Sequence, residues 1–74
     1  MACRVGITTD PERRRQEWLA DYPHMRNWRI VATYPTRSQA QRAENELSQR
    51  QGCMASPGGA GNEYAHWSVY YFEY

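Results

Sequence analysis

The sequence predicts a small α/β (α+β) domain in which two helices pack on a three-stranded sheet. Segments typical of strands and helices alternate in the order strand, helix, strand, helix, strand. Aromatic residues are concentrated in the strand-like segments, and 74 residues suffice for one domain, residues 1–74. A chain this short buries only about 60% of the surface that it exposes when unfolded, so large rings must supply much of its core.

The first half of the chain contains a strand, a helix and a second strand. Residues 2–8 are predicted as a short strand, and the Asp10-Pro11 pair is typical of a helix start. This helix covers residues 11–21 and ends before Pro23, because the residue preceding a proline disfavours the helical conformation. After a loop at residues 23–27, residues 28–34 are rich in β-branched and aromatic side chains, which predicts a strand that is closed by Pro35.

The second half begins with a helix. Thr36 or Ser38 is its predicted cap, since each is followed three residues later by a glutamine, and Gly52 marks its end after residue 51. The glycine-rich residues 55–62 are predicted as a loop. Residues 67–74 (WSVYYFEY) are almost continuously apolar and aromatic, which predicts a strand that is buried on both faces and central in the sheet.

All nine basic residues are arginines, and eight acidic residues bring the net charge to +1. This balance argues against a surface that is basic throughout, so binding to nucleic acid requires a local cluster. Arg13, Arg14 and Arg15 form such a cluster at the first helix, and Arg4 lies on the preceding strand. Guanidinium groups are permanently charged forks of donors that suit phosphate, whereas the alternative is a solvated basic helix face.

The two cysteines, Cys3 and Cys53, are too few for a disulfide scaffold and lack the spacing of a zinc site. No segment resembles a signal peptide or a membrane span. We therefore expect two small apolar thiols in a reducing cytoplasm and no membrane partner. A bridge between the two cysteines is the alternative.

The second helix carries a carboxylate on its apolar side. Ala40, Ala43 and Leu47 follow a helical period and should face the sheet, and Glu44 falls within their stripe. An ionised carboxylate that faces a core is costly unless it is paired or binds a metal. Glu44 therefore reaches the edge of the stripe, pairs with an arginine of the first helix, or acts as a metal-ligating or acid/base group.

The first helix offers two arginines for such a pair. Its apolar side includes Trp18 and Leu19, with Arg15 within that side and Arg14 at its edge. The helical wheel slightly favours Arg15, although either guanidinium has the reach to turn inward toward Glu44.

At this point the residues resemble the GIY-YIG nuclease superfamily, over roughly residues 3–47. The RVG of residues 4–6 is similar to the second half of the family's name motif, and the TTD of residues 8–10 is similar to its turn. Arg14 follows the glycine by eight residues, where the family has an arginine on its helix. The SQAQRAE of residues 38–44 is similar to the later family helix and ends on Glu44, which the helical wheel identifies independently.

The resemblance implies cleavage of a phosphodiester bond with a divalent metal, Mg²⁺ or Mn²⁺. By this resemblance Glu44 holds the metal, Arg14 stabilises charge on the phosphate, and tyrosines assist proton transfer. Gly6 and Asn62 correspond to supporting positions of the family.

The chain departs from the family pattern in its first strand. Arg4 stands where the family has a tyrosine, Trp18 stands where a histidine is common, and the family's own first strand is absent. We expect the last strand to fill that place as a circular permutation, pairing antiparallel with residues 2–8. Tyr70 or Tyr71 would then return a phenol to the site.

Two functional hypotheses follow. In the first, the chain is a metal-dependent endonuclease, a hydrolase that acts on nucleic acid, with DNA favoured over RNA. In the alternative, it is a catalytically impaired module that binds nucleic acid or an acidic protein surface, such as an inhibitor from a phage or mobile element. The chain is a monomer or a homodimer, and a last strand at the edge of the sheet would pair with a second copy.

Overall fold

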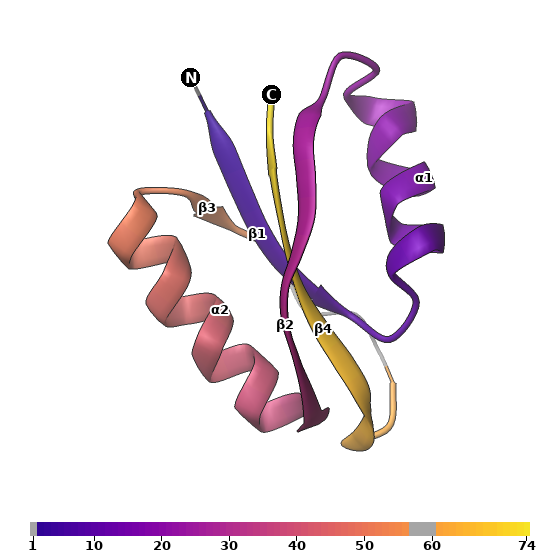
Figure 1. The fold of residues 1–74 in the computed structure, drawn as a ribbon, viewed down its shortest axis with the longest axis vertical. Coiled ribbons are helices and arrows are strands. Elements are labelled where there is room, and N and C mark those ends of the chain that lie inside the picture. Colours follow the sequence, from indigo (N-terminus) through magenta and orange to yellow (C-terminus); the bar gives the residue numbers. More distant parts are fainter. Residues whose placement is uncertain (1, 57–60) are drawn as a thin grey trace.

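The computed structural model describes residues 2–56 and 61–74 and shows a twisted sheet with a helix on either side (Figure 1). The elements are β1 (Cys3–Thr8), α1 (Pro11–Asp21), β2 (Arg26–Thr36), α2 (Arg37–Gln51), β3 (Met54–Ala55) and β4 (Tyr64–Glu73). The predicted α+β class is confirmed. The sheet has four strands instead of three, because residues 54–55 pair with β1 as a short parallel strand. Neither described helix has the length and apolar composition that crossing a membrane requires.

Local side-chain chemistry sets the ends of both helices. The Asp10 carboxylate accepts a hydrogen bond from the Arg13 backbone N–H at 3.2 Å, as a helix cap does. Of the two predicted caps of α2, Thr36 is the one used, since its hydroxyl accepts from the Gln39 N–H at 3.2 Å. Gly52 ends α2 with a left-handed φ of 68°, a conformation that glycine adopts without strain.

The observed strands are longer than the predicted ones. β2 begins at Arg26 and runs through Pro35 to Thr36, so the prediction that Pro35 closes the strand is wrong. The sheet order is β2-β4-β1-β3, which makes β2 an edge strand, and an edge strand tolerates a residue without an N–H donor. β4 begins at Tyr64, three residues before the predicted start at residue 67.

β4 lies in the middle of the sheet. It pairs antiparallel with β1 on one side and with β2 on the other, and residues 67–72 are all buried. The predicted pairing with the first strand and the predicted burial on both faces are confirmed. Because β4 has a neighbouring strand on each side, it has no free edge at which to pair with a second copy.

The two faces of the sheet are covered by different helices. Successive side chains of a strand point to opposite faces, and the odd-numbered residues of β1 and β4 pack against α2. The core on this α2 face consists of Val5, Ile7, Ala40, Trp67, Val69 and Tyr71. The opposite α1 face is built from rings, namely Trp18, Tyr22, Trp28, Tyr70, Phe72 and Tyr74. The sheet therefore separates α1 from α2 (Figure 1).

Ring contacts hold α1 on its face, because the helix has no fully buried residue. The Trp18 ring lies 5.3 Å from the Phe72 ring, and its indole N–H donates to the Tyr70 hydroxyl at 2.9 Å. Gly6 is opposite Tyr70 in the sheet, and a Cβ at this position would lie 2.2 Å from the Tyr70 hydroxyl oxygen. The missing side chain of Gly6 is therefore what lets the Tyr70 ring lie across β1 beneath α1.

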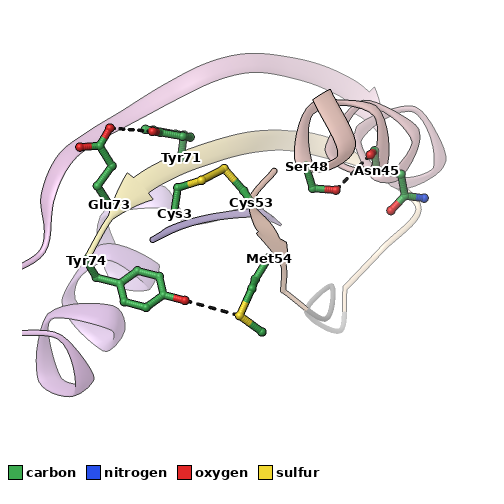
Figure 2. Close-up of a disulfide and its surroundings, with 8 residues drawn as sticks. All are labelled: Cys3, Asn45, Ser48, Cys53, Met54, Tyr71, Glu73 and Tyr74. Carbon is green, nitrogen blue, oxygen red and sulfur yellow. Dashed lines mark hydrogen bonds between the residues drawn. A yellow bond between two sulfur atoms is a disulfide. The ribbon is translucent and has the colours of Figure 1, made fainter. Parts of the chain in front are cut away.

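The two cysteines form a disulfide, so the expectation of two free thiols is wrong (Figure 2). The parallel register pairs Arg4 with Met54, which brings the preceding Cys3 and Cys53 opposite each other with their Cα atoms 4.8 Å apart. This separation is within the range that a disulfide spans. The sequence did not indicate this proximity because β3 has only two residues and no strand signature.

We predict that reduction destabilises the fold. The bridge closes a loop across a sequence separation of 50, for which the chain-entropy model gives about 4 kcal/mol of stabilisation. Urea unfolding followed by tryptophan fluorescence should therefore show a lower free energy of unfolding with dithiothreitol than without it. The Cys3→Ser/Cys53→Ser double variant is the control and should not respond to the reductant. Equal stability of the wild-type chain in both conditions would contradict this account.

Candidate functional site

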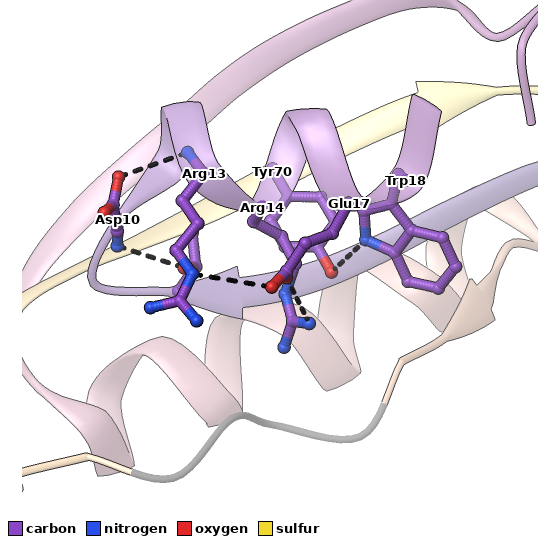
Figure 3. Close-up of polar contacts among 7 residues, drawn as sticks. Asp10, Arg13, Arg14, Glu17, Trp18 and Tyr70 are labelled. Carbon is purple, nitrogen blue, oxygen red and sulfur yellow. Dashed lines mark hydrogen bonds and ion pairs between the residues drawn. The ribbon is translucent and has the colours of Figure 1, made fainter. Parts of the chain in front are cut away.

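The end of β1 and the start of α1 form a rigid corner. The Thr8 hydroxyl accepts a hydrogen bond from the Asp10 N–H at 3.0 Å, and Asp10 in turn caps α1. The corner fixes the direction in which the helix leaves the sheet. As a result, the side chains of Arg13 and Arg14 lie together beside the end of β1, as Figure 3 shows.

A cleft of about 230 Å³ lies at this corner. It is lined by Thr8, Thr9, Asp10, Arg13, Arg14, Glu17 and Trp67. The helical wheel favoured Arg15 over Arg14, but the structure places Arg14 in the cleft. Arg15 is not among the lining residues and lies 3.9 Å from Glu12 instead.

The two guanidinium groups of the cleft share one partner. Glu17 lies 3.1 Å from Arg14 Nη1 and 3.5 Å from Arg13 Nε. The Arg13 side chain is 77% exposed and that of Arg14 is 27% exposed. Exposed ion pairs of this kind contribute only about 0–1 kcal/mol, so both guanidinium groups are available to exchange Glu17 for a phosphate.

Glu44 is fully buried on α2, as its place in the apolar stripe predicted. Burial raises the pKa of its carboxyl, while a hydrogen bond from the Gln41 side chain, the nearby Ser56 backbone and the charge of Arg37 act in the opposite direction. One carboxylate oxygen, Oε1, has no hydrogen-bond partner in the described part of the chain. A buried acceptor without a hydrogen-bond partner lowers the stability of the fold. Stability therefore does not explain why a glutamate occupies position 44.

No hydrogen bond or ion pair links Glu44 to an arginine of α1 in the described part of the chain. Arg14 belongs to α1, which covers one face of the sheet, whereas Glu44 belongs to α2, which covers the other (Figure 1). The cationic residue that influences Glu44 is Arg37, at the start of its own helix. The convergence of these side chains stays a prediction, because a helical wheel shows which side of a helix is buried and not which face of the sheet that helix covers.

Ser56 is a contact residue that the sequence did not reveal. It is 4% exposed, and its backbone N–H donates to the Val5 carbonyl at 2.9 Å at the edge of β1. Its hydroxyl lies 3.4 Å from Arg4 Nη1, and its backbone also contacts the Glu44 carboxylate. Arg4 and Glu44 therefore approach the same residue from the two sides of the sheet. No sequence signal distinguished Ser56 within a glycine-rich segment.

The two candidate tyrosines lie on different faces. Tyr70 is on the α1 face, where its hydroxyl accepts from Trp18. Tyr71 is on the α2 face, where its hydroxyl donates to the Glu73 carboxylate at 2.6 Å. This hydrogen bond raises the pKa of the Tyr71 phenol. Tyr70 is thus the tyrosine that lies under the helix carrying Arg14.

Asn62 acts through its backbone. Its carbonyl accepts a hydrogen bond from the Trp67 indole N–H at 2.8 Å, and Trp67 forms a wall of the cleft. This contact does not use the amide side chain, so the supporting role expected of Asn62 stays a prediction.

A divalent metal has one candidate ligand. Within residues 2–56 and 61–74, no three His, Cys, Asp or Glu side chains are grouped to hold an ion. Mg²⁺ is nevertheless bound in many proteins by one or two carboxylates with water completing its shell. The unpartnered Oε1 of Glu44 is the oxygen that would act as this ligand.

No family model, curated protein or solved structure matches this chain. The resemblance to GIY-YIG nucleases is therefore a hypothesis that rests on the motif residues.

We predict that replacing the buried carboxylate stabilises the protein at neutral pH. Because the pKa of Glu44 is raised on folding, its contribution is favourable below its unfolded pKa, about 4.3, and is lost as the pH rises through the folded value. Glu44→Gln should therefore exceed the wild type in free energy of unfolding at pH 7, with no such excess near pH 4. The exposed Glu46→Gln on the same helix is the control. A less stable Glu44→Gln at pH 7 would contradict the prediction.

Proposed function

We propose that this chain binds the phosphate backbone of nucleic acid, DNA in the first instance, through the cleft at the start of α1. One observation carries the proposal: two guanidinium groups meet in a single cleft at the start of α1 and share the exposed carboxylate of Glu17. Arginine forks are suited to phosphate oxygens.

Arg4 gives further support. The family that the sequence resembles has a tyrosine at this position, which assists proton transfer. An arginine stays charged at any working pH and cannot act as a base, but it adds affinity for phosphate. Arg4 lies on the α1 face, where its guanidinium stacks on the Trp18 ring at 4.8 Å. Its presence favours binding over catalysis.

The proposal predicts binding that weakens steeply with salt. Each of Arg13→Ala and Arg14→Ala should reduce the slope of log K against log salt concentration by about one, measured by fluorescence anisotropy with a labelled DNA duplex. Arg50→Ala removes the same charge from the last turn of α2, on the other face of the sheet, and is the matched control. An unchanged slope in both cleft variants, or an equal change in Arg50→Ala, would reject the proposal.

Metal-dependent phosphodiester cleavage is the second candidate. The buried Glu44 with its unpartnered oxygen favours it, as does the pairing of β4 with β1, which the permuted family order had predicted. In this candidate Glu44 holds a Mg²⁺ or Mn²⁺ ion, which supplies Lewis acidity at the phosphate. Arg4 is the cation whose contacts reach Ser56 beside Glu44, so it replaces Arg14 as the residue proposed to stabilise charge there.

Cleavage has its own test. If the second candidate holds, the folded protein nicks supercoiled DNA in Mn²⁺ or Mg²⁺, Glu44→Gln abolishes nicking, and the exposed Glu46→Gln retains it. Nicking by Glu44→Gln at the wild-type rate, or no nicking by the folded wild-type chain under any metal condition, would reject cleavage and leave the binding proposal in place.

A further inference from the structure

Among the described residues, no carboxylate pairs with Arg4 in the way that Glu12 and Glu17 pair with the arginines of α1. Its Nη1 and Nη2 have only long contacts, 3.4 Å to Ser56 Oγ and 3.8 Å to Met54 Sδ. Its Nε is buried without a hydrogen-bond partner among the described residues, and none of the ion pairs found there involves Arg4. A half-buried cation without a counter-ion is costly, and an anion bound at this position would remove that cost.

Aromatic rings hold this guanidinium in place. Its central carbon lies 4.8 Å from the centre of the Trp18 ring and 5.7 Å from that of the Tyr74 ring. Such stacking restricts the side chain without using its N–H donors. Arg4 therefore presents an ordered guanidinium at the side of α1, and each of its two NH₂ groups has one N–H beyond the contact that it makes to Ser56 or Met54.

A small apolar cavity is connected to Arg4 through the Tyr74 ring, which lines the cavity and lies 5.7 Å from the Arg4 guanidinium. The cavity holds about 190 Å³ and is lined by Asp21, Tyr22, Pro23, His24, Met25 and Tyr74. The Tyr22 and Tyr74 rings form its aromatic part, with centres 4.4 Å apart. Pockets for drug-sized ligands are about 300–1,000 Å³, so this cavity suits a single ring system. Asp21 and His24 supply hydrogen-bonding groups for the edge of such a ring.

We propose that Arg4, Trp18, Tyr22 and Tyr74 form a subsite for one unpaired nucleotide. Its phosphate binds Arg4 and its base enters the cavity against Tyr74, since that ring contacts both. The proposal rests on the proposed function, because the neighbouring phosphates of the same strand lie in the cleft at the other end of α1. An 11-residue helix is about 16 Å long, so a strand of a few nucleotides spans the two places. A base within a duplex is not free to enter the cavity.

The subsite predicts a preference for single strands that depends on Tyr74. Anisotropy is measured with a labelled 12-nucleotide oligo(dT) and a labelled 12-base-pair duplex, and circular dichroism checks that each variant is folded. Tyr74→Ala should weaken binding of the single strand about tenfold and leave duplex binding unchanged, because stacking of one base is lost. Tyr64→Ala is the matched control, since Tyr64 is 83% exposed and far from the cavity lining.

Arg4→Gln is the second variant and keeps a planar group beside Trp18. It should reduce the salt slope for the single strand by about 0.7, the value for one phosphate contact. If both Arg4→Gln and Tyr74→Ala bind the two DNAs as the wild type does, the subsite is wrong and the cleft proposal stands. If the wild-type chain binds neither DNA, both proposals are wrong. Complete displacement of oligo(dT) by the same nucleotide concentration of thymidine monophosphate would also overturn the subsite, as a free nucleotide would then be the ligand.

Discussion

The central position of β4 is the constraint on which the rest of the structure depends. A strand with neighbours on both sides and a helix over each face must be apolar on both faces, and residues 67–72 meet that requirement. Each face of β4 supports a different helix. Trp67 and Val69 pack against α2, whereas the rings of Tyr70 and Phe72 hold α1. Burial of β4 therefore anchors two helices that do not contact each other across the sheet.

This division separates two kinds of chemistry. The arginines of the proposed site belong to the α1 side, where Arg14 lines a cleft and Arg4 stacks on Trp18, whereas Arg29 and Arg37 stack on rings of the α2 face. Glu44, the one carboxylate that is buried among residues 2–56 and 61–74, belongs to α2 and has one oxygen without a hydrogen-bond partner there. Ser56, at the edge of β1, is the point where the two sides meet. A nucleic acid strand bound on the α1 face would reach Glu44 only by passing this edge. For this reason we propose binding as the first function and cleavage as the second.

The sequence predicted those features that local chemistry determines. Helix caps, the apolar run of β4 and the burial of Glu44 all follow from neighbouring residues or from a single period. Features that depend on the packing of distant segments were either not predicted or predicted incorrectly. Pro35 continues a strand because that strand lies at an edge, and Cys3 meets Cys53 through a pairing of two residues. The face on which each helix packs decides whether Arg14 meets Glu44, and no pattern within either helix contains that information.

The most direct test of this account is an NMR titration of the ¹⁵N-labelled chain with a short single-stranded DNA. Binding on the α1 face predicts that amide shifts change for Thr8 to Glu17 and around Tyr74, while those of residues 42–50 on α2 stay fixed. Shifts concentrated on α2, or no shifts at a large excess of DNA, would contradict the claim that the face built on Tyr70 and Phe72 is the functional one.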